Sequence, residues 1–520
     1  MYRPDAGDGV SRRRFLSMAG ATAGFVALSR LDALSGTRAG RGIRTPGSAL
    51  AQDGGATQVA LQAGTVELDL AGRAVTTWGY NGTVPGPVVR LRAGGRVQAT
   101  VTNALPEPTT VHWHGIALAN PMDGVPDVTQ PAIEPDATFE YDFVAPDAGT
   151  YFFHPHHGLQ LDRGLYAPLI IDDPSDPGGY DAEWVLVLDD WTDGVGRSPE
   201  AILARLQRGM GMGSGDGEMG GHSGMNHGAI GGGMDMGSGD GSSMDMEEMM
   251  SSALGSHGGD VSYPLFLING RAPKDPETFR AEPGQRVRLR VINAGSDTAF
   301  RVAIGGHRLT VTHSDGFAVE PVETDAVLLG MGERVDALVT VAEGAVPVVA
   351  HAEGKGGDAR AVLRGGPTGE APARRAKVDE LDGELVTSAR LRPAADVALS
   401  SAPPDRRHRL VLDGNHHSYR WTINGRVFDP DDEGLPVSDG QRVRLAFTNN
   451  STMWHPMHLH GHTFAVVRQR VPGVRKDTVI VRPGERVSVD FDADNPGKWM
   501  VHCHNAYHQE AGMMASVAYR

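Results

Sequence analysis

Histidines recur at every second position in several parts of this chain. It contains five His-x-His pairs, whereas random placement of 21 histidines among 520 residues would give about 0.85. Residues i and i+2 of a strand point to the same face, so each pair presents two imidazoles side by side. One tetrahedral metal uses about four ligands. Eight imidazoles therefore predict a cluster of two or three metal ions with open positions for a substrate. The four pairs in question are His112/His114, His154/His156, His458/His460 and His502/His504.

The chain has a single cysteine, Cys503, which lies between two of these histidines. By strand alternation its thiolate points away from the cluster and serves a second site. His508 and Met513 follow it in a Cys-x4-His-x4-Met pattern, and His455 lies upstream. Two His, one Cys and a weak axial Met form a blue-copper electron-transfer site. The alternative, a buried inert cysteine beside chance histidines, requires all three spacings to be accidental.

Three repeated units must position these residues. Each has an Asn-Gly turn followed by a run of the form G-x-R-V-x-x-x-x-x-N, which alternates apolar and polar residues and predicts a strand with one buried face. We therefore expect an all-β protein of three β-sandwich domains. A His-x-His motif ends only the first and third units. The cluster should lie between those two domains, and the middle domain should be a spacer that holds them in register. The runs begin at Gly95, Gly284 and Gly440.

Composition agrees with this reading. Gly (69) and Pro (33) favour short strands and turns over a helical bundle. The net charge of −16 is opposite in sign to the positive charge typical of nucleic-acid-binding proteins, so cations are the expected partners. The predicted domains are 57–175, 180–385 and 408–520, with a linker at 386–407.

The first 51 residues have the pattern of a twin-arginine export signal. Arg12 and Arg13 precede a short apolar run, and Ala49-Leu50-Ala51 is a candidate cleavage site. We expect translocation by the twin-arginine machinery, a mature chain outside the membrane, and a periplasmic, cell-envelope or secreted location. The alternative is an uncleaved membrane anchor.

A methionine-rich, low-complexity insert spans residues 209–260 within the second domain. It holds ten of the 19 methionines and no Lys or Arg. Thioethers are soft ligands that select Cu(I), so the insert is expected to gather Cu(I), although a flexible spacer is the simpler alternative. The candidate substrate ligands are Met244, Met246, Met249 and Met250 in the insert, and Met453 near the cysteine site.

Together these motifs resemble the multicopper oxidases, a family that includes laccases and bacterial cuprous oxidases. The resemblance implies Greek-key cupredoxin domains, four copper ions and the reduction of dioxygen to two waters. It assigns His455, Cys503, His508 and Met513 to a type 1 copper and His112 and His458 to a type 2 copper. It assigns a type 3 pair to His114, His154, His156, His460, His502 and His504.

The resemblance also implies an acid that supplies protons near the cluster. Asp123 matches the family position, whereas Gln509 stands where many relatives have Glu and Glu510 lies one residue further on. The expected function is oxidation of Cu(I) for copper detoxification, with laccase-like activity on phenols and diamines, by a monomer. The alternatives are a phenol, Mn(II) or Fe(II) oxidase and, in a different class, a copper-sequestering protein.

Overall fold

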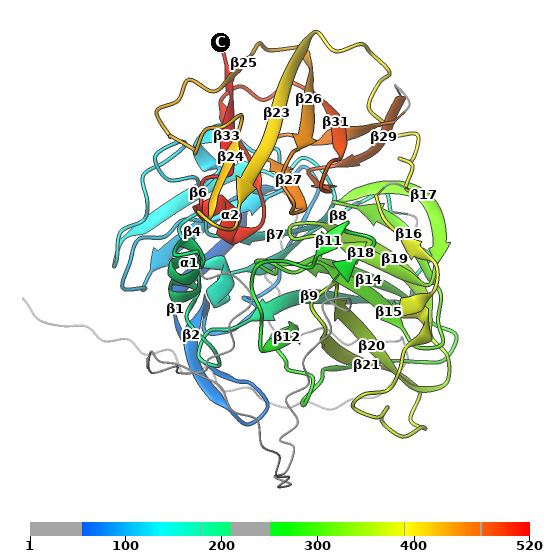
Figure 1. The fold of residues 1–520 in the computed structure, drawn as a ribbon. Helices are drawn as coiled ribbons and strands as arrows, with labels where there is room; N and C mark the ends of the chain where they lie inside the picture. The colour runs from blue at the N-terminus through cyan, green and yellow to red at the C-terminus, as the bar shows by residue number, and fades with distance from the viewer. Residues whose placement is uncertain (1–54, 177, 210–249, 389, 469–470) are drawn as a thin grey trace, which may run out of the picture. The chain divides into compact units, whose positions relative to one another are not determined.

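The computed structural model describes residues 55–176, 178–209, 250–388, 390–468 and 471–520 (Figure 1). Strands dominate these residues, and the two α-helices among them are short: α1 (Pro199–Gln207) and α2 (Ala506–Glu510). Three single turns of 3-10 helix complete the regular structure: η1 (Asn120–Met122), η2 (Leu161–Arg163) and η3 (Asp379–Asp382). The fold class expected from the repeats, all-β, is confirmed.

The first sandwich pairs two four-stranded sheets, ordered β2-β1-β4-β6 and β3-β8-β7-β5. Leu61 and Val97 of one sheet share a buried cluster with Leu91, Phe153 and Leu169 of the other. This shared core holds the two histidine-bearing strands, β5 and β7, in place. The strands are β1 (Thr57–Asp69), β2 (Ala74–Tyr80), β3 (Val89–Arg92), β4 (Arg96–Asn103), β5 (His112–His114), β6 (Thr138–Val144), β7 (Gly149–His154) and β8 (Ala167–Asp172).

The second sandwich pairs two six-stranded sheets, ordered β12-β9-β14-β19-β16-β17 and β13-β21-β20-β15-β18-β22. A two-stranded ribbon, β10-β11, precedes β12 in the chain. The strands are β9 (Ala182–Trp191), β10 (Met250–Ser251), β11 (Ser256–His257), β12 (Leu265–Ile268), β13 (Thr278–Ala281), β14 (Arg286–Asn293), β15 (Phe300–Ile304), β16 (Leu309–Ser314), β17 (Phe317–Thr324), β18 (Ala326–Leu329), β19 (Arg334–Thr340), β20 (Gly344–Ala352), β21 (Asp358–Gly365) and β22 (Leu385–Val386).

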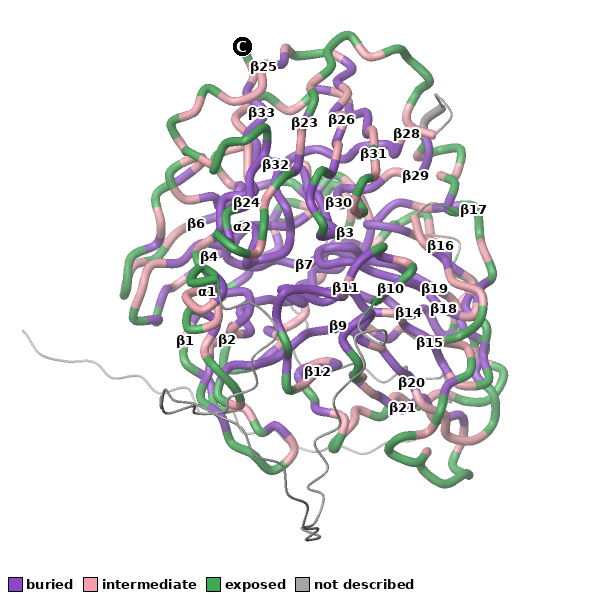
Figure 2. Tube along the Cα trace, viewed as in Figure 1, coloured by how far each residue is buried: buried purple, intermediate pink, exposed green. Residues whose placement is uncertain are grey.

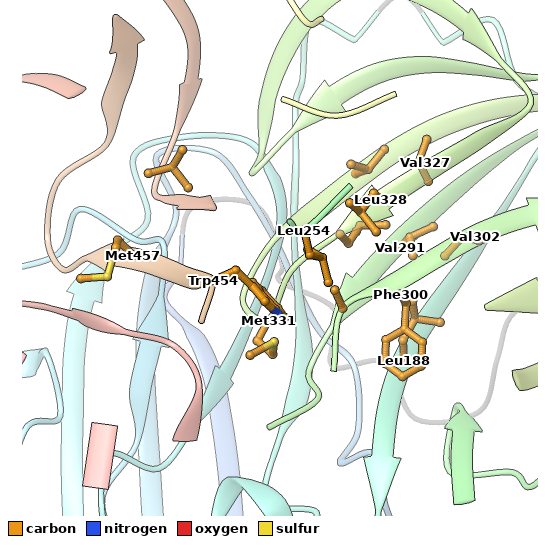
Figure 3. Close-up of a cluster of buried hydrophobic side chains, with 14 of the residues drawn as sticks. Leu188, Leu254, Val291, Phe300, Val302, Val327, Leu328, Met331, Trp454 and Met457 are labelled. Atoms are coloured by element: carbon orange, nitrogen blue, oxygen red, sulfur yellow. The ribbon is translucent and has the colours of Figure 1, made fainter. Parts of the chain in front are cut away.

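The third sandwich pairs a six-stranded sheet, β24-β23-β26-β31-β28-β29, with a five-stranded one, β25-β33-β32-β27-β30. Its core is continuous with that of the second sandwich, and Figure 3 shows Trp454 of the third beside Met331 of the second. The strands are β23 (Arg406–Asn415), β24 (Arg420–Ile423), β25 (Leu435–Val437), β26 (Arg442–Asn449), β27 (His455–Leu459), β28 (Phe464–Arg468), β29 (Val471–Lys476), β30 (Thr478–Val481), β31 (Arg486–Asp492), β32 (Lys498–Cys503) and β33 (Met514–Tyr519).

The repeated sequence run forms the same strand in each sandwich. β4, β14 and β26 each pair in parallel with the first long strand of their unit and antiparallel with a later one. The closing asparagines of the runs, Asn103, Asn293 and Asn449, are buried, and each side-chain amide donates to two backbone carbonyls. A buried amide in these positions satisfies carbonyls that would otherwise lack a partner. In the first and third units the histidine-bearing strand follows directly.

Two predicted boundaries fall differently in the structure. Residues 250–260, expected to belong to the unpacked insert, form the β10-β11 ribbon, and Figure 3 shows Leu254 within the buried cluster. Leu254 is an apolar side chain that can be buried, unlike the Gly, Ser and acidic residues before it. The expected linker at 386–407 is partly tied to the second sandwich, since Glu320 donates a backbone hydrogen bond to Arg392.

Some predictions concern residues outside the described part of the chain. These are the export signal at 1–51 and most of the insert, with Met244, Met246 and Met249. Among the described residues, no helix is long and apolar enough to cross a bilayer.

Candidate metal centres

Paired strands from two sandwiches present the eight clustered histidines. In the first sandwich β5 lies beside β7 with His112 opposite His154, and in the third β27 lies beside β32 with His458 opposite His502. The rings of His112 and His460 stack with centroids 3.8 Å apart across the two sandwiches. Figure 2 shows buried chain throughout this region, and none of the eight histidines exposes more than 7 % of its surface. The structure thus brings all eight predicted imidazoles into one buried cluster.

The imidazoles converge in threes. Ligand nitrogens lie within 4.8 Å of one another in each of three groups. The first and third groups share His114, and the ring of His112 in the third stacks on that of His460 in the second, so the cluster is continuous. The groups are His114, His154 and His504; His156, His460 and His502; and His112, His114 and His458.

Carbonyl and carboxylate oxygens fix the tautomer of several of these rings. Nδ1 of His502 lies 3.0 Å from the carbonyl oxygen of Cys503, and Nδ1 of His460 lies 2.9 Å from Oδ2 of Asp123. A carbonyl or carboxylate oxygen only accepts, so both Nδ1 atoms carry the proton and both Nε2 atoms bear lone pairs. Those two Nε2 atoms face each other at 3.0 Å. Lone pairs at this distance repel unless a cation lies between them, so the donors fit a metal.

A second observation also fits a metal. Nδ1 of His112 and Nδ1 of His458 are each 2.9 Å from a backbone carbonyl, of Asp123 and Asp477 respectively. Their Nε2 atoms are buried and have no hydrogen-bond partner among the described residues. Buried polar atoms without partners are rare and call for an explanation, which a coordinated ion provides.

Burial keeps six of the eight cluster imidazoles neutral. Desolvation lowers the pKa of His114, His154, His460, His502 and His504 well below the usual value, and lowers that of His156 to about 3. Neutral imidazole is the form that binds a metal. The cluster therefore has its lone pairs available at neutral pH.

The second donor set surrounds Cys503. Its Sγ lies 3.6 Å from Nδ1 of His455 and 3.6 Å from Nδ1 of His508, and those two nitrogens are 3.1 Å apart. All three residues are fully buried. Met513 adjoins them: its carbonyl accepts from the Cys503 N–H at 3.0 Å and its N–H donates to the His508 carbonyl at 3.0 Å. Two imidazoles and a thiol converging in this way suit a copper ion.

Polar partners turn both imidazoles of this site toward the sulfur. Nε2 of His508 donates to Oδ2 of Asp260 at 3.0 Å, and Nε2 of His455 lies 2.8 Å from Oγ of Ser451. Ser451 Oγ donates to Asn449 Oδ1 and so accepts from His455. Burial opposes ionisation of Asp260, but hydrogen bonds from His416 and His508 outweigh it and hold the pKa of the carboxyl below its usual range. The Nδ1 lone pairs are thereby directed at the metal position, an orientation typical of metal-bound histidines.

Burial raises the pKa of the Cys503 thiol, so without a cation the sulfur stays protonated. A bound metal stabilises the thiolate and releases the proton. The short peptide segment from Cys503 to His502 and His504 joins this site to the histidine cluster.

Two residues that the sequence reading did not identify also support the cluster. Asp477, between β29 and β30, accepts a hydrogen bond from Nε2 of His114 at 3.1 Å. The guanidinium of Arg334, from the second sandwich, holds both carboxylate oxygens of Asp477 at 2.7 and 2.6 Å. Both side chains are fully buried, and Arg334 also donates to the carbonyl of Thr150 in the first sandwich. All three sandwiches meet at this ion pair.

The two predicted acids lie in different environments. Asp123 follows η1, is buried and contacts the cluster histidines His460 and His112, the latter at 3.2 Å from its Oδ1. Glu510 ends α2, and burial raises the pKa of its carboxyl, which shares a hydrogen bond with Gln509. The structure therefore brings Asp123, but not Glu510, into hydrogen-bonding contact with cluster histidines.

The two described candidates for Cu(I) binding differ in exposure. Met453 is completely buried, so an ion arriving from solvent does not meet its thioether. Met250 exposes 57 % of its surface at the start of β10. Of the two, only Met250 is open to solvent.

The fold and the donor sets together define a copper protein built from cupredoxin-like domains. Residues 62–176, 239–366 and 401–520 match sequence models described as multicopper oxidase. The chain is 45 % identical over 464 residues to "Multicopper oxidase MmcO" of Mycobacterium tuberculosis, covering 87 % of this chain and 85 % of that one. It is 30 % identical to the "Copper resistance protein A homolog" of Pseudomonas syringae pv. tomato, covering 89 % and 92 %.

A solved multi-copper oxidase from Pseudomonas thermotolerans superposes with a TM-score of 0.65 at 26 % identity, covering 89 % of this chain and 99 % of that one. The chain belongs to the multicopper oxidase family. It is thus a copper-dependent oxidoreductase that uses dioxygen as electron acceptor, as the sequence motifs predicted.

Proposed function

We propose that this protein oxidises Cu(I) to Cu(II) and passes the electrons to dioxygen, with broad activity on phenols and diamines. The observation that carries the proposal is that the side chains of His502, Cys503 and His504, which are consecutive in the chain, contribute to both donor sets. An electron taken from a reductant at the Cys503 site is one residue of chain away from the cluster ligands His502 and His504. Copper, when bound, supplies the one-electron redox chemistry that couples such a reductant to four-electron reduction of dioxygen.

We propose four resident copper ions. The type 1 ion is held by His455, Cys503, His508 and Met513. His112 and His458 hold the type 2 ion, and their unpartnered Nε2 atoms support this assignment. One type 3 ion takes His114, His154 and His504, and the other takes His156, His460 and His502, in line with the convergence of their nitrogens in threes.

Reduction of dioxygen to water consumes protons, and Asp123 is proposed to deliver them. Its Oδ2 accepts a hydrogen bond from Nδ1 of His460, whereas its buried Oδ1 lies 3.2 Å from Nδ1 of His112 and accepts no hydrogen bond from the described residues. Oδ1 is therefore the atom that takes up a proton from solvent and releases it toward the cluster. Glu510 lacks such a contact and is not assigned this role.

Cu(I) is favoured as reductant over phenols, Mn(II) or Fe(II) for two reasons. Ten methionines, which suit Cu(I), lie in one stretch of the sequence, and the exposed Met250 ends that stretch. Two relatives at 27–30 % identity are named copper resistance proteins. We further propose that the signal at residues 1–51 exports the folded protein by the twin-arginine route.

Oxygen uptake by the copper-loaded protein tests this function. Cu(I), Fe(II) and a phenol are supplied separately at equal concentration, and we expect the fastest oxygen uptake with Cu(I). Cys503→Ser should abolish both the oxygen uptake and the blue absorption. Preference for the phenol or for Fe(II) would reassign the substrate. Copper binding without any oxygen uptake would identify a copper-sequestering protein instead.

A further inference from the structure

Asp297, a buried residue of the middle sandwich, connects two chain segments that flank the cysteine site. Its Oδ1 accepts from the side-chain amide of Asn505 at 2.5 Å and from the backbone N–H of Asp260 at 3.2 Å. Its Oδ2 accepts from the N–H of Val261 at 2.8 Å and from Nζ of Lys355 at 2.5 Å. One carboxylate therefore binds the segment that carries Asp260 and, at the same time, the residue that caps α2.

Asn505 lies close to two donors of the cysteine site, because it follows Cys503 by two residues and precedes His508 by three. Its side-chain Oδ1 accepts from the N–H groups of Tyr507 and His508 at 3.0 and 3.1 Å, which caps α2. Burial raises the pKa of the Cys503 thiol, and a hydrogen bond from the backbone N–H of Asn505 acts in the opposite direction. Since Oδ1 of Asn505 faces the helix, its amide nitrogen faces Asp297. The two contacts together fix one orientation of this amide.

The segment before Asp260 packs directly on Asp297. A Cβ on Gly259 would lie 2.3 Å from Oδ2 of Asp297 and 2.4 Å from its carbonyl oxygen, which is closer than a side chain can approach. The next residue, Asp260, accepts the hydrogen bond from Nε2 of His508. Asp297 therefore sets the position of the backbone from which Asp260 reaches His508.

Lys355 compensates the charge of the Asp297 carboxylate. Its ammonium group also donates to the carbonyl oxygen of Val261 at 3.0 Å and lies 4.9 Å from the centre of the Tyr263 ring. The side chains of Lys355 and Asp297 expose 4 % and 0 % of their surface. A buried charge needs a partner. The ion pair thus permits a charged acceptor of four hydrogen bonds at this depth.

The two segments that Asp297 joins are the ones that orient His508, since Asn505 binds its backbone N–H and Asp260 binds its ring. We propose that Asp297 is a positioning residue for the type 1 site, an inference that rests on the proposed assignment of that copper ion. None of the four hydrogen bonds of Asp297 comes from a copper ligand. It acts through Asn505 and Asp260, by holding the cap of α2 and the backbone at Asp260 in a fixed relation.

The test begins with Asp297→Asn in the copper-loaded full-length protein. Asparagine has the same size, but an NH2 group replaces one acceptor oxygen, so it cannot accept all four hydrogen bonds. Loss of a group that orients metal ligands typically lowers metal affinity by about 10–100-fold. We expect the concentration of a copper chelator that removes half of the blue absorption to fall by about that factor. The maximum of the blue absorption should also shift.

Asp336→Asn is the matched control, because Asp336 is also a buried carboxylate of the middle sandwich with cationic partners. Its side-chain hydrogen bonds come from Thr150, Arg288 and Arg290, and none comes from the two segments at the cysteine site. This variant should lose resistance to urea, whereas its blue absorption and its resistance to the chelator should match those of wild type. Equal losses of copper in the two variants would identify general destabilisation as the cause and overturn the positioning role.

A double variant separates the charge of Asp297 from its hydrogen bonds. Asp297→Asn combined with Lys355→Met leaves no unpaired buried charge and should recover much of the resistance to urea. The chelator should still remove copper at the lower concentration, because Asn505 and Asp260 have not regained their shared acceptor. Recovery of copper retention together with stability would overturn the positioning role.

Asn505→Ala tests the route of the effect. If Asp297 acts through Asn505, the double variant Asp297→Asn/Asn505→Ala should lose much less resistance to the chelator than the product of the two single factors. Factors that multiply in full would overturn this route. Blue absorption in wild type that Asp297→Asn leaves unchanged, with unchanged chelator resistance, would overturn the positioning role alone. A copper-loaded wild type without blue absorption would overturn the type 1 assignment and this inference with it.

Discussion

Removal of the Arg334 guanidinium should destabilise the whole protein, because this side chain neutralises a carboxylate that water does not reach. Arg334 and Asp477 are both fully buried, and the guanidinium binds both carboxylate oxygens. Two unit charges about 4 Å apart interact by about 4 kcal/mol at an effective dielectric constant of about 20. Breaking such a buried pair by removing one partner costs about 3–5 kcal/mol. We therefore expect Arg334→Met to lower the free energy of unfolding by about 3–5 kcal/mol.

Reversible urea unfolding of the copper-free protein, followed by tryptophan fluorescence, measures this loss. Arg334→Lys keeps the charge but not the two-pronged geometry, so it should lose less. The surface pair Arg426–Asp432 supplies a matched control, since both partners are largely exposed and Arg426→Met should cost at most about 1 kcal/mol.

A double variant separates the effect of the ion pair on stability from its effect on copper binding. Arg334→Met combined with Asp477→Asn leaves no unpaired charge and should recover most of the lost stability. It should still bind copper less tightly, by about 10–100-fold, because His114 loses its carboxylate acceptor. A loss below about 1 kcal/mol in Arg334→Met, or a double variant as unstable as the single one, would refute the reasoning.

Two further predictions concern acid stability and the insert. Burial opposes ionisation of Asp336, but the guanidinium groups of Arg290 and Arg288 outweigh it and hold its pKa at about 2. Its contribution to stability, about 2 kcal/mol, should be complete above pH 4 and be lost as pH falls toward 2, so the stability difference between wild type and Asp336→Asn, measured by urea unfolding, should shrink over that range. Deletion of residues 210–249 should lower the rate of Cu(I) oxidation far more than that of phenol oxidation, and equal losses would contradict a role in Cu(I) delivery.

The donor atoms could be predicted from sequence because each strand has a period of two. His502, Cys503 and His504 occupy successive positions, so two side chains face one way and the third faces the other. The same rule places His112 with His114. That the pairs of the first and third units meet in one cluster follows from the sequence repeats, whereas the facing of His112 and His460 across the two sandwiches is seen only in the structure.

The residues that orient the donors were not predicted because their partners are distant in sequence. Asp260 contacts His508 from 248 positions away, and Arg334 contacts Asp477 from 143 positions away. A partial signal exists, since three consecutive charged residues, Arg475, Lys476 and Asp477, lie between Val474 and the apolar stretch that ends at Val481. A charge inside an apolar strand must be paired when it is buried, but the sequence does not identify the partner.

The boundary of the insert was placed too late for a related reason. Composition distinguishes residues 209–249 from their surroundings, but it does not separate the next eleven residues, which are also rich in Gly and Ser. Those eleven carry Leu254, which enters the core, and Asp260, which orients His508. Because these eleven residues resemble the insert in composition, the sequence did not distinguish the segment that orients His508 at the cysteine site.

These contacts change the role of the middle domain, which lacks the histidine pairs and was expected to be a spacer. It supplies Asp260, which fixes the tautomer of His508 at the cysteine site, and Arg334, which fixes Asp477 and through it His114 at the cluster. A spacer needs only to match the shapes of its neighbours, whereas these two contacts determine which nitrogen of a ligand faces the metal. The middle domain without metal ligands therefore takes part in building both metal sites, and its substitutions at these positions should alter metal binding as well as stability.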